Sequence, residues 1–240
     1  MSHHDAVNHN NLGTPEAATF ASALRAALAG PAPWDFLQAL RDAGRLGQLL
    51  PEVDALWGVP QPEAHHPEID TGRHCLMVLR QACALSADPA LRFAALVHDL
   101  GKAATPPAEW PRHVGHEQSG LPIIAALSTR LGLPEDWADL GMAACRWHLM
   151  VHQAANLRPA TLHDLLAALS DKWRQPQRLE SLLLVCEADA RGRLGHEQRP
   201  YPQGGLLRRC YRAAAAVPAS PRQRELRIAI IRAALKEAQP

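Results

Sequence analysis

The stretch LRFAALVHDLGKAATPPAEWPRHVGHEQ, residues 91–118, is the most informative part of this chain. It opens with an apolar run that has the composition of a buried helix, and this run leads directly to His98 and Asp99. Asp99 follows Leu96 by three residues, so a helix over 89–100 places it on the apolar face. A buried carboxylate without a partner costs several kcal/mol. The stretch therefore predicts a helix that ends by presenting polar side chains to a partner, and a metal ion is one candidate.

Apolar residues recur at helical spacing along most of the chain, with no alternating β-branched run long enough for a sheet. The pattern predicts an all-α fold. The expected helices are 17–29, 34–43, 71–85, 89–100, 117–131, 135–152, 161–169, 176–191, 204–216 and 221–237. Two proline-rich segments, 58–70 and 105–111, are expected to be fixed loops. Gly101 and Gly192 are expected to cap helices in the left-handed conformation.

The composition indicates a globular protein of a reducing compartment. The chain has 240 residues, of which 47% are hydrophobic, and its five cysteines form no C-x-x-C pair. We expect a disordered leader over 1–16 and a single all-α domain over 17–240. No signal peptide or membrane-spanning run is visible, so we expect no membrane partner and a cytoplasmic location.

The charges are unevenly distributed along the chain. Residues 171–240 contain 14 Lys and Arg against 7 Asp and Glu, although the whole chain has a net charge of only +1. A basic surface suits a phosphate-bearing partner, but an arginine-rich helix face is more often simply solvated. On charge alone, the solvated face is the favoured interpretation.

Three more polar residues fall on apolar helix faces. Asp189 follows Val185 by four residues, and His74 and His148 hold similar places in their own helices. Taken singly, each histidine is more often a hydrogen-bonded core residue, and Asp189 could pair with Arg191 or Arg193. Likewise, Lys102 alone suits a helix C-terminus, and His113, His116 and His152 alone suit solvated positions. Taken together with His98 and Asp99, these residues favour one shared divalent cation.

The order His74, His98-Asp99, Asp189 resembles the HD superfamily of metal-dependent phosphohydrolases. The strings LLPEVDALWGVPQP, HPEIDTGRH, VHDLGKAATPPAEWPRHVGHE, EADARGR and YPQG look like the C-terminal HD domain of bacterial CCA-adding tRNA nucleotidyltransferase. The likeness covers about residues 34 to 215, and residues 17–60 resemble the end of the neck region of that family. It implies an all-α helical bundle of the HD-domain type.

This chain departs from that family in one respect. The family carries nucleotidyl transfer in an N-terminal head, and residues 1–33 are too short to contain one. We therefore expect no nucleotidyltransferase activity from this polypeptide by itself. It is either a free-standing relative or a fragment of a longer enzyme, and the irregular leader favours the former.

The resemblance implies a phosphohydrolase of nucleotides or RNA ends. The implied activities are 2',3'-cyclic phosphodiesterase, 2'-nucleotidase and phosphatase, supported by nickel, cobalt, manganese or magnesium. His74, His98, Asp99 and Asp189 occupy the ligand positions. Nitrogen and oxygen ligands suit such ions, which activate a water for in-line attack on phosphorus. Asp99 is then a candidate proton acceptor.

Other polar residues receive more limited roles. Lys102 is the candidate phosphate clamp, and so we class it with Asp99 as catalytic. His116 and His148 stand where some HD enzymes bind a second metal, so either a metal or the substrate phosphate is possible. Weaker candidates for the site are Arg112, His113 and His152.

Several alternatives stay open. The chain could be a noncatalytic tRNA-binding or accessory module, or an HD hydrolase for another nucleotide, such as guanosine tetraphosphate. A separate chain could also supply the nucleotidyltransferase head, and an exposed apolar patch at Trp34, Phe36, Leu37 and Leu40 would favour such an assembly.

Overall fold

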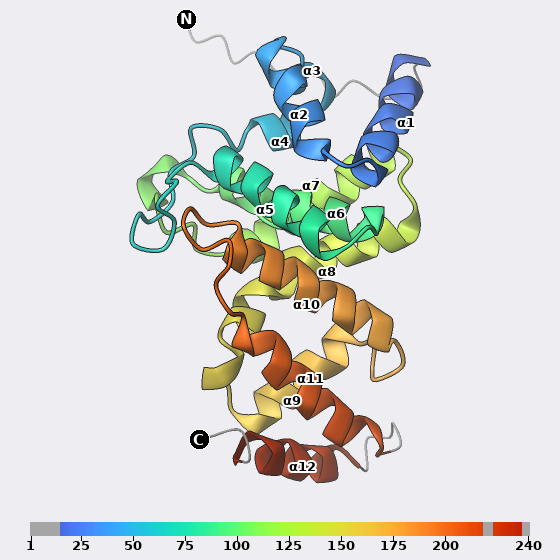
Figure 1. Cartoon of the computed structure of the whole chain (residues 1–240), viewed down its shortest axis with the longest axis vertical. Coiled ribbons are helices and arrows are strands. Elements are labelled where there is room, and N and C mark those ends of the chain that lie inside the picture. Colours follow the sequence, from blue (N-terminus) through green and yellow to red (C-terminus); the bar gives the residue numbers. More distant parts are fainter. Residues whose placement is uncertain (1–14, 218–222, 237–240) are drawn as a thin grey trace, which may run out of the picture.

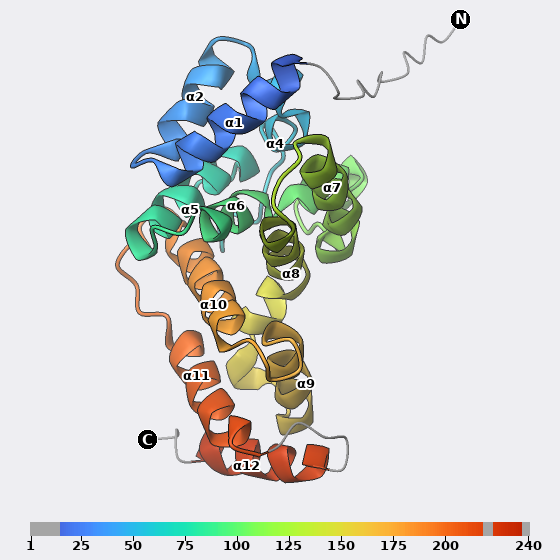
Figure 2. The same cartoon turned by 90° about the vertical axis from the view of Figure 1, so that its right-hand side faces the viewer.

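The computed structural model describes residues 15–217 and 223–236 (Figures 1 and 2). In these residues the backbone forms helices and loops, and the β-pairing amounts to one isolated bridge between Pro60 and Asp70. The predicted all-α fold is confirmed. Most of the predicted leader lies outside the described residues, but Pro15 and Glu16 already belong to the first helix.

The helices follow one another along the chain, and the longest helix-free connection, residues 55–70, lies before α5. The α-helices are α1 (Pro15–Ala29), α2 (Pro33–Asp42), α3 (Leu46–Leu49), α4 (Pro51–Asp54), α5 (Thr71–Leu85), α6 (Pro89–Val97), α7 (His116–Arg130), α8 (Glu135–His152), α9 (Pro159–Leu169), α10 (Pro176–Arg191), α11 (Pro202–Ala215) and α12 (Arg224–Lys236). The 3-10 helices are η1 (Leu100–Ala104), η2 (Pro107–Glu109) and η3 (Ala154–Asn156). The sequence pattern does not predict α3 and α4, because four-residue helices are too short to show a period.

Helices α5, α6, α8 and α10 form the centre of the molecule. Helix α10 packs against α5, α6 and α8, and α7 packs against α8 and η1. The helices α1 to α4 cover one end of this centre, while α9, α11 and α12 form the opposite end of an elongated molecule (Figures 1 and 2). Among the described residues, no helix combines the length and the apolarity that a membrane crossing requires.

Helix α6 ends earlier than the sequence predicts. Its last residue is Val97, and the predicted helix to residue 100 is corrected because Asp99 leaves the helical conformation, with φ −109° and ψ 10°. His98 is the C-cap, and the chain tightens at once into η1. The aspartate therefore sits at a turn between two helices, where its carboxylate can reach side chains from several elements.

Gly101 and Gly192 are not left-handed caps, which corrects the second prediction about helix ends. Neither has a positive φ. A Cβ on Gly101 would lie 2.0 Å from the carbonyl oxygen of His116, and a Cβ on Gly192 would lie 2.7 Å from the Cα of Val78. Both glycines are needed for close approach of two segments. The contact at Gly101 brings the start of α7 next to η1 and hence close to Asp99.

The apolar residues of α2 do not form an exposed patch. Leu37 is buried, and Trp34, Phe36 and Leu40 are half-buried and pack against the core. The exposed apolar patch that would favour a separate head subunit is therefore not formed by these four residues.

Candidate metal centre

The four predicted ligands meet in the interior of the protein. His74 comes from the first turns of α5, His98 and Asp99 follow α6, and Asp189 comes from the last turn of α10. All four are at most 3% exposed. His74 Nε2 lies 3.0 Å from Asp189 Oδ1, and His98 Nε2 lies 3.3 Å from Asp99 Oδ2. Three elements distant in sequence thus converge on one small volume.

Two further histidines surround the other oxygen of Asp99. His116, at the start of α7, has its Nε2 3.4 Å from Asp99 Oδ1, and His148 on α8 has its Nε2 3.6 Å from the same atom. Ligand atoms of Asp99, His116 and His148 all lie within 4.8 Å of one another, as do those of His74, His98 and Asp99. The structure therefore joins two possible ion positions through Asp99.

The orientation of three histidines leaves their Nε2 atoms available as ligands. His98 Nδ1 donates to the carbonyl of Ala95 at 2.8 Å, and His116 Nδ1 donates to the carbonyl of His113 at 2.8 Å. His148 Nδ1 likewise faces the carbonyl of Cys145 at 2.9 Å. A neutral ring that uses Nδ1–H in this way carries its lone pair on Nε2, the state that binds a metal.

The centre contains buried polar atoms that need a cation. Neither His98 Nε2 nor Asp99 Oδ1 has a hydrogen-bond partner among the described residues. Lone pairs and a carboxylate oxygen that face one another repel unless a proton or a metal ion lies between them. A set of imidazole nitrogens and carboxylate oxygens suits divalent transition metals. The residues present therefore fit the ion that the sequence suggests.

Lys102 binds the carboxylate of Asp99 directly. Its Nζ lies 2.7 Å from Asp99 Oδ2 and also donates to Gln61 Oε1, and the side chain is buried. Lys102 therefore balances the charge of the ligand at the centre, and two of its donors are already used.

Asp189 is held by histidines and not by an arginine. His152 Nε2 lies 2.6 Å from Asp189 Oδ2, and the hydroxyl of Tyr201 bonds His152 Nδ1 at 3.0 Å. Arg191 instead pairs with Glu187 at 2.8 Å, so the alternative of an aspartate–arginine pair there is wrong. Arg193, the other arginine considered, forms no hydrogen bond or ion pair with Asp189 either.

The remaining weaker candidates lie apart from the cluster. His113 Nδ1 is hydrogen-bonded to the Thr105 hydroxyl at 2.6 Å and Nε2 donates to the carbonyl of Pro60, so both ring nitrogens are occupied. Arg112 is exposed on the surface. Neither side chain contacts His74, His98, Asp99 or Asp189, although the main-chain carbonyl of His113 accepts a hydrogen bond from His116 Nδ1.

Glu68 and His66 are site residues that sequence reasoning missed. Glu68 Oε1 lies 2.9 Å from His74 Nδ1 and 3.0 Å from His66 Nδ1. The His74 contact is short but not aligned with the ring N–H, so it is a charge contact and not a hydrogen bond. Both residues come from the proline-rich loop 58–70, where no helical period exists to indicate which side chains point inward.

Charges at the centre shift several protonation equilibria. Burial alone would lower the pKa of His98, but the adjacent carboxylates of Asp99 and Asp189 outweigh it and raise that pKa to about 9. Burial would raise the pKa of Asp99, but His98 and Lys102 hold it well below its usual range. Burial lowers the pKa of His148 to about 3. The metal-free centre thus keeps a proton on His98 in the place where a metal would bind.

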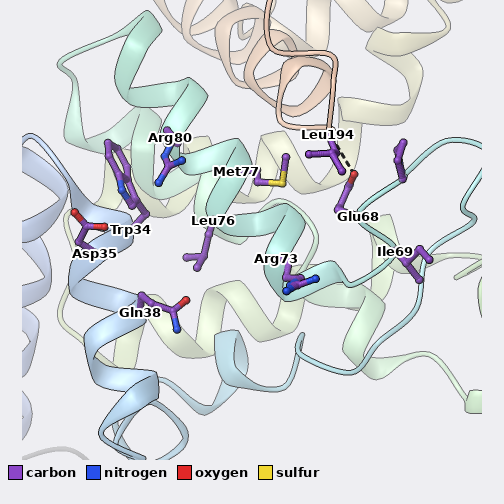
Figure 3. Close-up of a pocket in the computed structure, with 11 residues that line it drawn as sticks. Trp34, Asp35, Gln38, Glu68, Ile69, Arg73, Leu76, Met77, Arg80 and Leu194 are labelled. Carbon is purple, nitrogen blue, oxygen red and sulfur yellow. Dashed lines mark hydrogen bonds between the residues drawn. The ribbon is translucent and has the colours of Figure 1, made fainter.

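A pocket of about 740 Å³ lies beside the centre, between α2, α5 and the loop before α5 (Figure 3). Its lining includes Trp34, Arg73, Met77 and Arg80, and none of the four predicted ligands. Glu68 borders this pocket and also contacts His74. Glu68 is therefore the residue that links the pocket to the ligand cluster, and none of the four predicted ligands lines the pocket.

Comparison with known proteins identifies a protein family and several relatives that are similar in sequence to this chain. Residues 71–193 match the family described as HD domain. A Multifunctional CCA protein from Methylococcus capsulatus is 54% identical over 195 residues, which are 81% of this chain and 46% of the relative. Those from Alkalilimnicola ehrlichii and Vibrio cholerae are 52% identical over 198 residues and 55% identical over 185 residues, covering 82% and 77% of this chain and 48% and 46% of the relatives. The chain spans about half the length of these curated relatives.

Proposed function

The chain belongs to the HD domain family, and from this premise we propose that it is a metal-dependent phosphohydrolase that acts on nucleotides or RNA ends. The observation that carries the proposal is the ligand cluster, in which His98 Nε2 and Asp99 Oδ1 are buried without a partner. Such atoms are costly unless a cation binds them. The site residues are therefore His74, His98, Asp99 and Asp189, with His116 and His148 for a second ion or the substrate phosphate.

The proposed substrates are 2',3'-cyclic phosphates, 2'-nucleotides and simple phosphomonoesters. The similarity to Multifunctional CCA proteins supports an RNA end or a nucleotide as the natural class. We propose the same all-α HD unit over 17–240, with 17–60 related to a neck region, and a cytoplasmic location. Nickel, cobalt, manganese and magnesium are the candidate ions.

Residues of the chain would hold the carboxylates of Asp99 and Asp189 in fixed positions for the reaction. A bound divalent ion would supply Lewis acidity for water and for the phosphate. Lys102 fixes Asp99 Oδ2, which leaves Oδ1 directed at His116 and His148. His152 fixes Asp189 Oδ2 in the same manner. Asp99 thus has one anchored oxygen and one oxygen without a hydrogen-bond partner, which could bind an ion or accept a proton from water, whereas Asp189 Oδ1 is bonded to His74 Nε2.

The test is an assay of the metal-stripped protein. A panel of 2',3'-cyclic nucleotides, 2'-nucleotides, deoxynucleoside monophosphates, guanosine tetraphosphate and an aryl phosphate is offered with each of the four ions added back. We expect turnover of at least one substrate that depends on the ion and disappears in Asp99→Ala. No ion-dependent turnover on the whole panel, or equal turnover in the variant, would contradict the proposal.

A noncatalytic tRNA-binding module is the alternative, and the structure gives it less support. Several arginines of the basic C-terminal third are neutralised, including Arg208 by Glu180 and Arg224 by Asp164. The charge available for contacts with RNA phosphates is therefore smaller than the sequence suggests. Salt-sensitive tRNA binding without hydrolysis of any substrate on the panel would favour this alternative.

A further inference from the structure

Arg193 is a partly buried arginine without a protein partner. Within residues 15–217 and 223–236 its side chain makes no hydrogen bond or ion pair, and its Nε is shielded from solvent. Arg191, two residues earlier, differs in this respect: it pairs with Glu187 at 2.8 Å and donates to the carbonyl of Arg199 at 3.1 Å. A buried guanidinium nitrogen without an acceptor is costly, so Nε of Arg193 needs an acceptor from outside the described chain, and its charge favours an anion.

The backbone on both sides of Arg193 is fixed to the elements that hold His74. Gly192 packs so tightly on α5 that a Cβ there would lie 2.8 Å from the backbone nitrogen of Val78, one turn after His74. The amide of Leu194 donates to Glu68 Oε2 at 3.2 Å (Figure 3). These contacts of Gly192 and Leu194 fix the backbone of Arg193, and neither of them involves the Arg193 side chain.

The positive charge of Arg193 affects the pKa of His66 and that of Tyr201, two residues next to the ligand cluster. The pKa of His66 is lowered to about 4, mainly by burial, and the charges of His74, Lys102 and Arg193 act in the same direction. Burial also raises the pKa of Tyr201, an effect that the charge of Arg193 opposes. The His66 ring lies 4.6 Å from the His74 ring, centroid to centroid. Leu194, the next residue, bonds Glu68, whose other oxygen contacts both His66 and His74, so the backbone at Arg193 lies beside this side of the ligand cluster.

We propose that Arg193 binds the phosphoryl group of the substrate beside the metal centre, an inference that rests on the proposed function. A guanidinium presents a planar fork of donors that matches two oxygens of a phosphate. Lys102, the cation that the sequence suggests for this task, already donates to Asp99 and Gln61. Arg193, by contrast, makes no side-chain hydrogen bond or ion pair with any residue that the structure describes. The ligand class is a phosphomonoester or cyclic phosphate of a nucleotide.

The test measures the affinity for adenosine 2'-monophosphate by calorimetry and its hydrolysis in parallel, both on metal-loaded protein. Arg193→Ala is expected to weaken binding about 10- to 100-fold, the range for a hydrogen bond to a charged group. Arg193→Lys keeps the charge but not the fork, so we expect an intermediate affinity. Added guanidinium ion should partly restore Arg193→Ala. Arg191→Ala, the matched control, should bind within about twofold of the wild type.

The outcomes separate this inference from the proposed function. Wild-type hydrolysis with unchanged affinity and KM in Arg193→Ala would overturn the role of Arg193 and leave the function intact. Nucleotide binding that depends on Arg193, without turnover of any substrate, would reject the hydrolase and keep the binding site. Loss of bound metal or of thermal stability in both Arg193 variants would identify a structural role and overturn the inference. Absence of both binding and turnover in the wild type would reject both.

Discussion

His116 Nε2 lies 3.3 Å from His148 Nε2, and both atoms lie within 3.6 Å of Asp99 Oδ1. Both rings use Nδ1 to face main-chain carbonyls, so both lone pairs point into the same small space. Two lone pairs and a carboxylate oxygen in contact form a stable group only around a proton or a metal ion. This relationship connects α7 and α8 to the ligands of α5, α6 and α10.

Replacement of His148, which removes the Nε2 lone pair of that residue, should weaken metal binding. We expect His148→Gln to lower the affinity for Mn²⁺ about 10- to 100-fold, the range found when metal-site groups are replaced. Titration of the stripped protein by calorimetry measures this. The exposed His65→Gln on loop 58–70 is the control and should bind as the wild type does. If His148→Gln bound Mn²⁺ as tightly as the control His65→Gln, His148 would be excluded as a ligand.

Glu68 should act as a positioning residue for His74. Its Oε1 lies 2.9 Å from His74 Nδ1, so Glu68→Gln removes the negative charge that orients the ring and raises its basicity. We expect about a tenfold loss of Mn²⁺ affinity with the helical content unchanged by circular dichroism. Glu63→Gln, on the exposed part of the same loop, is the matched control. A loss of the same size in the control would argue against the contact.

Lys102 should stabilise the metal-free protein more than the loaded one. Lys102→Met leaves the buried carboxylate of Asp99 without its cation, a change that typically costs about 3 to 5 kcal/mol. A bound divalent ion supplies positive charge to the same carboxylate, so saturating Mn²⁺ should reduce the loss. Urea unfolding with and without Mn²⁺ measures both values. An identical loss in the two states would contradict this account of Lys102.

The metal-free protein should lose stability as the pH rises. The pKa of His98 is raised from its ordinary 6.5 to about 9, so its contribution is fully present below 6.5 and is lost as the pH passes 9. The shift corresponds to a loss on the order of 3 kcal/mol in the free energy of unfolding. The comparison is urea unfolding of the stripped protein at pH 6 and pH 9. A free energy that is constant over this window would show that His98 is not protonated in the metal-free centre.

The helices, and the burial of the polar residues proposed as ligands, can be predicted from the sequence because both depend on helical spacing. Asp189 follows an apolar stripe within a single helix, and α10 spans Pro176–Arg191 as the pattern predicts. His74 and His148 were found in the same way. The periodic part of the chain thus predicted which polar side chains face the core.

The contacts made by loops and the exact ends of helices cannot be predicted from helical spacing. Glu68 reaches His74 from a loop without a period, and His152 was ranked low because a residue at the end of a helix gives no indication of its partner. Gly101 looks like a cap in the sequence, but its role depends on a backbone 15 positions away, at His116. Such contacts are set by tertiary packing.

Gly101 itself should not tolerate a side chain. Its Cβ would overlap the carbonyl oxygen of His116 at 2.0 Å, and main chain cannot move aside as a flexible side chain can. We expect Gly101→Ala to lower the free energy of unfolding by at least about 2 kcal/mol and to weaken metal binding, because His116 would be displaced. Gly205→Ala, whose Cβ would meet nothing closer than 3.8 Å, is the control for helix-internal glycine. Wild-type stability in Gly101→Ala would refute this contact.

The most direct test of the centre is an anomalous difference map from crystals grown with Mn²⁺ and measured at the manganese edge. The account predicts a peak between His74, His98, Asp99 and Asp189, at bonding distance from His98 Nε2 and from an oxygen of Asp99. The peak should be absent from crystals of Asp99→Ala. A map with no peak at these four residues, or with one only on the protein surface, would contradict the metal centre.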